Sequence, residues 1–137
     1  MAKVLGVGGV FLKSDNPQTL QAWYERHLGL PAQPGCPVLF PWRHADTGQP
    51  GMTVWSLFPR QTDYFGPGGQ AVMVNYIVDD LDGVLASLRA AGARVEDRRE
   101  DTEYGRFGWA TDPEGNRMEL WQPPASPPQG PGPEAGA

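Results

Sequence analysis

The sequence predicts an α+β domain in which two helices cover one face of mostly antiparallel strands. Three observations lead to this prediction. Two amphipathic segments each follow a strand, further strand-like segments follow each helix, and the glycines that end the helices, Gly29 and Gly92, lie about 63 residues apart. Because the two halves share little sequence identity, the repeat is one of organisation.

The whole chain has 137 residues, a formal net charge of −5 at pH 7 and a pI of about 4.9. This length suits one compact domain with its own core. The chain has no basic stripe, so neither nucleic acid nor an anionic membrane is an expected partner. We expect a cytoplasmic protein, because no signal peptide and no bilayer-spanning apolar run occurs. Cys36 is the single cysteine, and we expect a buried or half-buried thiol.

The first half begins with a predicted strand over residues 4–12. A helix should follow, with Asn16 as its N-cap and Pro17 at its first position, because the Asn side chain can accept from a free backbone N–H and proline lacks one. Gly29 ends this helix. Its apolar face consists of Leu20, Trp23, Tyr24, His27 and Leu28.

Two further strands are predicted over residues 38–42 and 52–58, on either side of a polar, turn-rich link. Residues 59–69 then form a predicted loop that is rich in glycine and proline. Unless another part of the chain covers them, Tyr64 and Phe65 should be exposed on this loop.

The second half repeats this order with a strand over residues 71–78 and a helix capped by Asp79 and Asp80. Gly92 closes the helix, and Val95 begins a short, charged segment that suits a solvated edge strand or loop. The apolar face of the helix consists of Leu81, Val84, Leu85 and Leu88.

A hairpin over residues 104–121 completes the second half, with Asp-Pro-Glu-Gly-Asn supplying the turn. In its second strand, Glu119 lies on the face opposite Met118 and Leu120, in a segment otherwise suited to burial. A carboxylate in such a position needs a partner or a function.

The composition changes at Gln122 to a run rich in proline and glycine, which cannot build a core. We therefore predict one domain over residues 1–122, with modules of about 4–60 and 70–122, and a disordered tail over 123–137.

Six short motifs occur in order along residues 4–122. They are Asp15-Asn-Pro17, Leu20-Gln-Ala-Trp-Tyr24, Leu28-Gly-Leu30, Val78-Asp-Asp-Leu81, Ala91-Gly-Ala93 and Asp112-Pro-Glu-Gly-Asn-Arg-Met-Glu-Leu120. Together they resemble the vicinal oxygen chelate superfamily, which includes glyoxalase I, bleomycin-resistance proteins and extradiol dioxygenases. The resemblance implies two βαβββ modules whose strands form a cup-shaped mixed sheet, with helices on the convex side and the ligand or metal inside. It also implies a homodimer.

Metal-using members of this superfamily take His, Glu, Gln or Tyr ligands from four cup positions, on the first and last strand of each module. If the predicted helices of this chain are aligned with those of the superfamily, the residues near these positions are Gly9, Trp55, Met73 and Glu119. Only Glu119 is a ligand type for a divalent ion. We therefore expect no metal or other cofactor, with a divalent ion on unusual ligands as the disfavoured alternative. This departure argues against glyoxalase I or dioxygenase activity.

Strand alternation assigns side chains to the interior of the implied cup. The predicted binding residues for a small organic molecule are Phe11, Trp55, Met73, Asn75, Glu119 and Trp121, with Trp42, His44, Tyr104 and Trp109 at the walls or rim. Aromatic walls would stack on a planar ligand, and Glu119 could accept from a cationic or hydroxyl group.

Three functions stay open. The first is a metal-free binding protein of the bleomycin-resistance type that holds an aromatic or planar ligand. The second is a lyase, isomerase or dioxygenase in which Glu119, with a pKa raised by burial, acts as base or metal ligand. The third is a structural or interaction module, in which the aromatic residues fill the core and a dimer interface and Glu119 pairs with Arg106 or Arg117.

Overall fold

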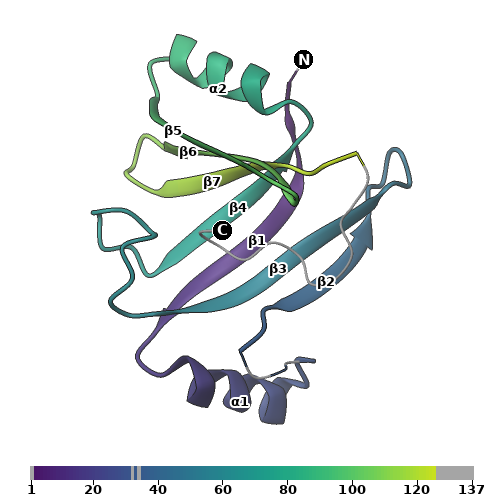
Figure 1. The fold of residues 1–137 in the computed structure, drawn as a ribbon, viewed down its shortest axis with the longest axis vertical. Helices are drawn as coiled ribbons and strands as arrows, with labels where there is room; N and C mark the ends of the chain where they lie inside the picture. Colours follow the sequence, from purple (N-terminus) through teal and green to yellow (C-terminus); the bar gives the residue numbers. More distant parts are fainter. Residues whose placement is uncertain (1, 32, 34, 126–137) are drawn as a thin grey trace.

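The computed structural model describes residues 2–31, 33 and 35–125. In chain order its elements are β1 (Val4–Ser14), α1 (Pro17–Leu28), β2 (Val38–Arg43), β3 (Pro50–Pro59), β4 (Val72–Val78), α2 (Leu81–Ala90), β5 (Arg94–Thr102), β6 (Gly105–Thr111) and β7 (Arg117–Gln122). All strands belong to one sheet in the order β2-β3-β1-β4-β7-β6-β5 (Figure 1). The predicted α+β class is confirmed. The predicted tail lies outside the described residues from position 126 onward.

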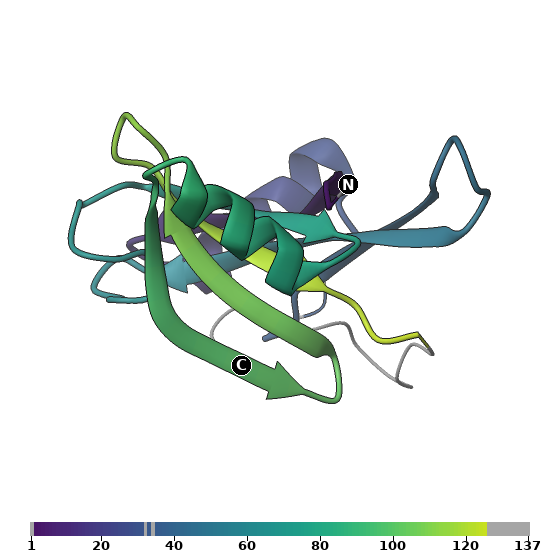
Figure 2. The same ribbon diagram turned by 90° about the horizontal axis from the view of Figure 1, so that it is seen from above.

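The two halves of the chain build this sheet around one central pair of strands. β1 and β4 pair antiparallel in the middle, and each has a parallel partner on its outer side, β3 beside β1 and β7 beside β4. Parallel neighbours need a crossover connection, and α1 and α2 lie in these crossovers. Figure 2 shows β5 and β6 bending away from the central strands. The sheet is therefore curved, with a concave and a convex face.

Both helices begin and end where the sequence predicts. The Asn16 side chain accepts from the backbone N–H of Thr19 at 3.2 Å, and Gly29 leaves α1 with a φ of 67°. Asp80 accepts from the N–H of Gly83 at 3.2 Å at the start of α2. Within the described segments, neither helix has the length and apolar character needed to cross a lipid bilayer.

The second half of the sheet packs a different core on each face. Leu81 and Leu85 of α2 are buried against the convex face. The strand residues under α2 are Val78, Ala110 and Leu120, and the buried residues on the concave face are Ile77, Phe107, Trp109 and Trp121. The alternation predicted for the hairpin is therefore confirmed.

The register of β3 corrects one prediction for the first half. β3 runs parallel to β1 with Gly9 opposite Val54, and Val54 is buried in the concave cluster that contains Phe11. Its neighbour Trp55 must then point to the convex side, where it packs edge-on against Tyr24 of α1 with ring centroids 4.9 Å apart. Trp55 therefore does not line the cup, because the true register differs by one residue from the predicted one.

The segment between β3 and β4 also differs from expectation. We expected Phe65 to be exposed unless another part of the chain covered it, and the concave cluster does cover it, so that Phe65 is fully buried. Tyr64 is half-buried and its ring stacks on Phe58 of β3 with centroids 5.7 Å apart. This segment therefore folds back against the concave face instead of projecting into solvent.

Candidate functional site

Three side chains form one row across the concave face. Asn75 on β4 is the direct neighbour of Glu119 on β7, and Glu119 is the direct neighbour of Trp109 on β6. Adjacent strands lie about 4.8 Å apart, so these side chains rise next to one another from the sheet. None is more than 2% exposed. The sheet register thus builds a polar row inside an apolar, aromatic surrounding.

Both carboxyl oxygens of Glu119 receive a hydrogen bond. Asn75 Nδ2 donates to Oε1 at 2.6 Å, and the hydroxyl of Tyr64 donates to Oε2. Among the described residues Glu119 forms no ion pair, with Arg106 and Arg117 bound to other acids. Burial raises the pKa of Glu119 from its ordinary value of 4.5 to about 8. The carboxyl group is therefore mostly protonated at pH 7, and in this form it donates its proton to the Tyr64 hydroxyl oxygen, which can accept as well as donate.

Two atoms of the row have unused hydrogen-bonding capacity. Asn75 Oδ1 is a buried acceptor and Trp109 Nε1 a buried donor, and neither has a partner among the described residues. Leaving such a group unpaired costs about 1–3 kcal/mol. Native proteins rarely tolerate that cost without a reason, which makes this row the leading candidate for contact with a bound molecule.

Tyr64 reaches the row because its segment is anchored at both ends. Gln70 holds the far end, where its Nε2 donates to the carbonyl oxygens of Val72 and Arg117, each at 2.9 Å. The near end is fixed by Phe65 in the core. Arg117 Nη1 also donates to the Tyr64 carbonyl oxygen. These contacts place the Tyr64 ring edge-on to Trp109, with centroids 6.3 Å apart.

Arg117 is the buried cation beside the row. Its guanidinium donates through Nε and Nη2 to Glu96 at 2.6 and 2.9 Å, which is a bidentate pair. It also lies against Trp109, with Cζ 5.6 Å from the ring centroid, and Arg98 covers Trp109 with its Cζ at 4.5 Å. Two guanidinium groups therefore flank the indole whose Nε1 has no partner.

An open cavity of about 1100 Å³ is lined by three residues that contact Trp109, namely Tyr64, Arg98 and Arg117. No residue of the row itself lines it. Its charged walls are balanced, with Arg94, Arg98 and Arg117 facing Asp63, Glu96 and Glu114. The cavity is open to solvent, and Tyr64, which lines it, is hydrogen-bonded to Glu119.

Several predicted site residues do meet on the concave face. Phe11 and Met73 are buried together with Phe65, and Trp121 stacks on Phe107 with centroids 6.0 Å apart. These residues are the apolar surroundings of Asn75 and Glu119. Direct contact between them and a ligand stays a prediction.

The predicted rim residues lie at the edge of the second concave cluster. Trp42 and Tyr104 are partly buried against it, and the Tyr104 carbonyl oxygen accepts from Trp121 Nε1 at 2.8 Å. His44 packs on Trp42 with ring centroids 4.7 Å apart. His44 therefore lies between β2 and β3 beside an aromatic neighbour, and its place at the rim of a ligand site stays a prediction.

Metal ligation does not fit the residues of this row. Gly9 pairs with Val54 on one side and with Asn75 on the other, and Asn75 pairs with Glu119. These residues therefore occupy the four cup positions, and Asn75 stands where we predicted Met73. Glu119 is the single ionisable group of this row, and both its oxygens already accept hydrogen bonds. In the described part of the chain no three His, Cys, Asp or Glu side chains gather as a metal site would need.

The sequence prediction missed Tyr64, Gln70 and Arg117 as site residues. Tyr64 and Gln70 belong to an irregular segment, where no periodicity indicates a direction. Arg117 was assigned as a possible partner of Glu119, but it binds Glu96 instead. An adjacent Tyr-Phe pair in a glycine-rich loop was the one available signal.

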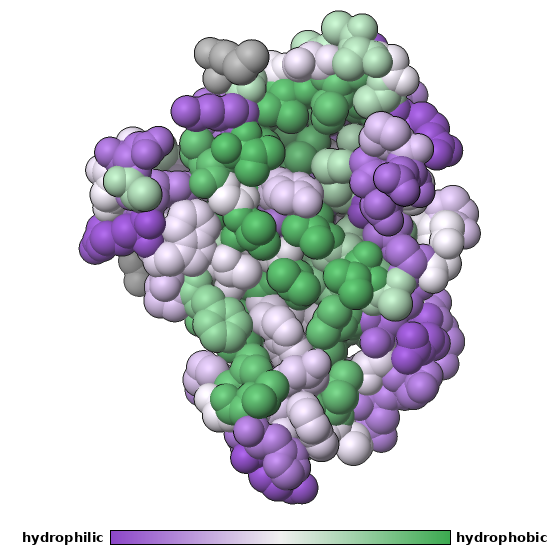
Figure 3. Space-filling view, turned by 180° about the vertical axis from the view of Figure 1, so that it is seen from behind, coloured by the Kyte–Doolittle hydropathy of each residue, from purple (hydrophilic) through white to green (hydrophobic). Residues whose placement is uncertain are grey.

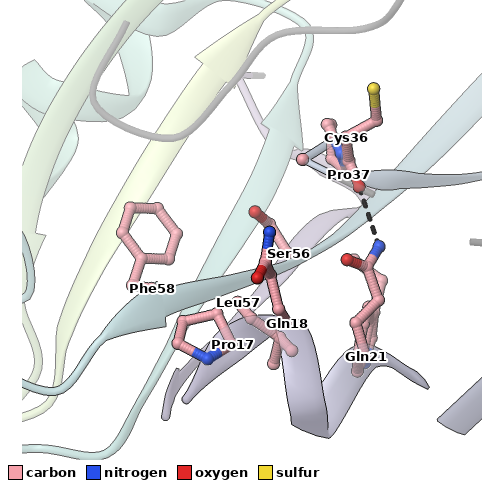
Figure 4. A pocket seen from close by; sticks show the side chains of 10 residues that line it. Pro17, Gln18, Gln21, Cys36, Pro37, Ser56, Leu57 and Phe58 are labelled. Carbon is pink, nitrogen blue, oxygen red and sulfur yellow. Dashed lines mark hydrogen bonds between the residues drawn. The ribbon is translucent and has the colours of Figure 1, made fainter. Parts of the chain in front are cut away.

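A second, smaller cavity of about 220 Å³ lies between α1 and β3 (Figure 4). Gln18 and Gln21 line it from α1, and Gln21 Nε2 donates to the Cys36 carbonyl oxygen at 3.0 Å. Cys36 is exposed, which corrects the expected burial of this thiol. No residue of the Asn75–Glu119–Trp109 row lines this cavity.

Comparison with known proteins agrees with the geometry. The model of the glyoxalase-like domain family matches residues 9–121. A solved methylmalonyl-CoA epimerase in complex with methylmalonyl-CoA and NH4+ is 15% identical, with a TM-score of 0.64 over 91% of this chain and 99% of that one. The Mycobacterium tuberculosis methylmalonyl-CoA epimerase is 18% identical, with a TM-score of 0.55 over 88% and 89%.

At these identities the solved structures establish a shared fold and nothing finer. The comparison with curated proteins gave no match. The family match covers β1 from Gly9 onward, all of β4 and the complete Asn75–Glu119–Trp109 row. The chain therefore belongs to the glyoxalase-like domain family, within the vicinal oxygen chelate superfamily.

Proposed function

We propose that this protein binds a planar or aromatic small organic molecule in its concave face without the help of a metal ion. The observation that carries the proposal is the hydrogen-bonded row around Glu119. Asn75 and Tyr64 occupy both carboxyl oxygens, while Asn75 Oδ1 and Trp109 Nε1 keep capacity for a ligand. A few convergent polar groups within aromatic walls are the usual makeup of a small-molecule site.

Tryptophan fluorescence tests this proposal. The protein would be titrated with a panel of planar metabolites and aromatic antibiotics, in the presence and absence of excess EDTA, after its metal content has been measured. We expect at least one saturable change that EDTA leaves unaltered. The proposal fails if no panel member binds, or if binding requires a stoichiometric divalent ion.

A matched pair of variants locates the signal. Trp109→Phe should remove most of the fluorescence change, because Trp109 lies in the row. Trp23→Phe should keep it, because Trp23 is 48% exposed on α1. The opposite pattern would place the ligand outside the concave face.

A second candidate function is catalysis of the lyase or isomerase type with Glu119 as general base. The observation that favours it is the pKa of Glu119, which at about 8 is close to that of an efficient base at neutral pH. The solved structures of similar fold include epimerases. Full turnover by Glu119→Gln on any substrate found would exclude this role.

The proposal includes a homodimer. Val4, Val7 and Val72 lie on the convex side of the central strands and are 49%, 39% and 44% exposed. Figure 3 shows apolar surface gathered over the middle of this face. Exposed apolar patches of this kind favour association. Light scattering of the protein and of a Val7→Lys/Val72→Lys variant would test it, with dimer expected for the first and monomer for the second.

A further inference from the structure

We propose that the outer edge of β3 at Ser56, Leu57 and Phe58 binds a peptide segment in extended conformation, which adds to the sheet as a short strand. The cavity of about 220 Å³ beside this edge would receive one uncharged side chain of the peptide. We call the edge and the cavity together the β3 edge groove. No residue of the Asn75–Glu119–Trp109 row lines it, so this second site does not depend on the proposed small-molecule function.

β3 is longer than the strand that covers its outer edge. β2 pairs with β3 only over residues 50–55, whereas β1 pairs with the inner edge as far as Pro59. In the second half of the chain, by contrast, β6 covers the whole of β7. Within the described residues, no strand therefore pairs with the outer edge at residues 56–58. Successive strand residues direct their backbone N–H and C=O groups to alternate sides, so at least one of these residues presents them outward.

Two features of the chain before β2 leave this edge uncovered. If β2 were extended by one residue, Pro37 would lie opposite Ser56, and proline has no backbone N–H with which to continue the ladder. The carbonyl oxygen of the preceding Cys36 accepts from Gln21 Nε2 of α1 at 3.0 Å. Gln21 Nε2 also donates to the Gln33 carbonyl oxygen at 3.4 Å. These bonds hold the chain before β2 on α1 and away from β3.

The cavity follows the edge of β3 and does not lie on either face of the sheet. Consecutive strand residues point to opposite faces, yet residues 55–58 all line the cavity. Gln18 and Gln21 of α1 and residues 35–37 form its other walls (Figure 4). Extended peptides bind at such places, because the open edge offers main-chain hydrogen bonds and a neighbouring pocket receives a side chain of the peptide.

The lining of the cavity determines which side chain can enter. Its volume of about 220 Å³ is below the range of about 300–1,000 Å³ that is usual for small-molecule pockets, and it suits one side chain. Among the described residues that line it, none is acidic or basic, and Pro17, Leu57 and Phe58 supply apolar surface. A charged side chain would lose water there without gaining an ionic partner. We therefore expect an apolar side chain such as leucine.

Three capped peptides test this inference by NMR titration of the full-length ¹⁵N-labelled protein. The first is acetyl-Lys-Thr-Val-Thr-Leu-Thr-Lys-amide, the second is the same peptide with its four central amides N-methylated, and the third has lysine in place of leucine. We expect the first peptide to shift the backbone amide signals of residues 56–58 in a saturable way and to leave those of β7 unchanged. The other two should bind at least about tenfold more weakly, because they lose main-chain donors or the apolar side chain.

Cys36 provides a matched control on the protein, because it is the one cysteine of the chain, is exposed and lines the cavity. Alkylation with N-ethylmaleimide should abolish peptide binding by the wild-type protein and leave binding by Cys36→Ser unchanged. Equal binding of the N-methylated peptide, binding that survives alkylation, or no binding of the first peptide would overturn the inference. Concentration-dependent protection of the amides of residues 56–58 without peptide would also overturn it, because a second copy would then occupy the edge.

Discussion

Asn75 and Glu119 come from different strands of the second half of the chain, 44 positions apart, and meet through a hydrogen bond of 2.6 Å inside the curved sheet. The parallel pairing of β4 with β7 makes them direct neighbours. Both side chains are nearly inaccessible to water, and a hydrogen bond is electrostatically stronger in such an interior than at the surface. The following predictions depend on this pair and on the residues that hold it.

Glu119 should make the stability of the fold depend on pH. Its folded-state pKa of about 8 lies above the unfolded value of 4.5, so the folded state binds the proton more tightly. The stabilisation that protonation of Glu119 gives to the folded state is therefore complete below pH 4.5 and is lost as the pH rises toward 8. Over this range the free energy of unfolding should fall by up to about 1.4 kcal/mol for each pH unit. Urea unfolding between pH 5 and 8.5 measures this slope.

In Glu119→Gln the slope over this pH range should largely disappear, and the variant should be the more stable protein at pH 8.5 by about 2–4 kcal/mol. Glu114→Gln, a change at an exposed turn position, is the matched control and should keep the wild-type slope. A wild-type protein whose stability does not change over this range would contradict the burial of a neutral Glu119.

Gly8→Ala should destabilise the protein by about 1–3 kcal/mol. A methyl group at this position would press on Asn75 Oδ1 and would lie 2.8 Å from both Ile77 Cγ1 and Trp121 Cε3. Gly68→Ala is the control, since its nearest neighbour would be a backbone oxygen 4.0 Å away. Thermal unfolding of both variants measures the difference, and equal Tm values would show that the row can move to make room.

Arg117→Lys should cost about 1–3 kcal/mol, because lysine cannot make the bidentate pair with Glu96 and would leave a buried charge less well paired. The exposed pair of Arg60 with Asp15 provides the comparison, and Arg60→Lys should change the free energy of unfolding by less than about 0.5 kcal/mol. Similar losses in the two variants would mean that Arg117 is solvated in solution.

Tyr64→Phe should loosen the segment between β3 and β4. The change removes the hydrogen bond to Glu119 Oε2 but keeps the ring on Phe58. Backbone amide exchange of residues 60–70 should become about tenfold faster, while exchange in β6 and β7 stays the same. Faster exchange throughout the sheet would instead indicate that Tyr64 supports the whole core.

The order of the elements followed from local sequence signals. Asn16, Asp80 and the glycines after each helix set the helix boundaries through short-range hydrogen bonds and φ preferences, so they could be assigned without a fold. The hairpin faces also followed from alternation, which placed Trp109 and Trp121 on one side and Leu120 on the other. These signals act within a few residues, and the structure confirms them.

The register between distant strands could not be obtained in the same way. We assigned Trp55 to the cup by counting residues from the preceding helix. The direction of its side chain depends instead on how β3 pairs with β1, and in the structure Val54 lies opposite Gly9. A change of one residue moves a side chain to the opposite face. The pairing of Arg117 with Glu96 and not with Glu119 depends on tertiary packing of the same kind.

The sequence by itself determined the fold class, the two helices, the hairpin and the face on which Glu119 lies, because alternation, periodicity and capping depend on neighbouring residues. Only the tertiary structure decided what surrounds Glu119. Asn75 and Trp109 become its neighbours through strand pairing, and Tyr64 reaches it from an irregular segment. Hydrogen bonds and burial at that point depend on residues far apart in the chain, and no local pattern specifies them.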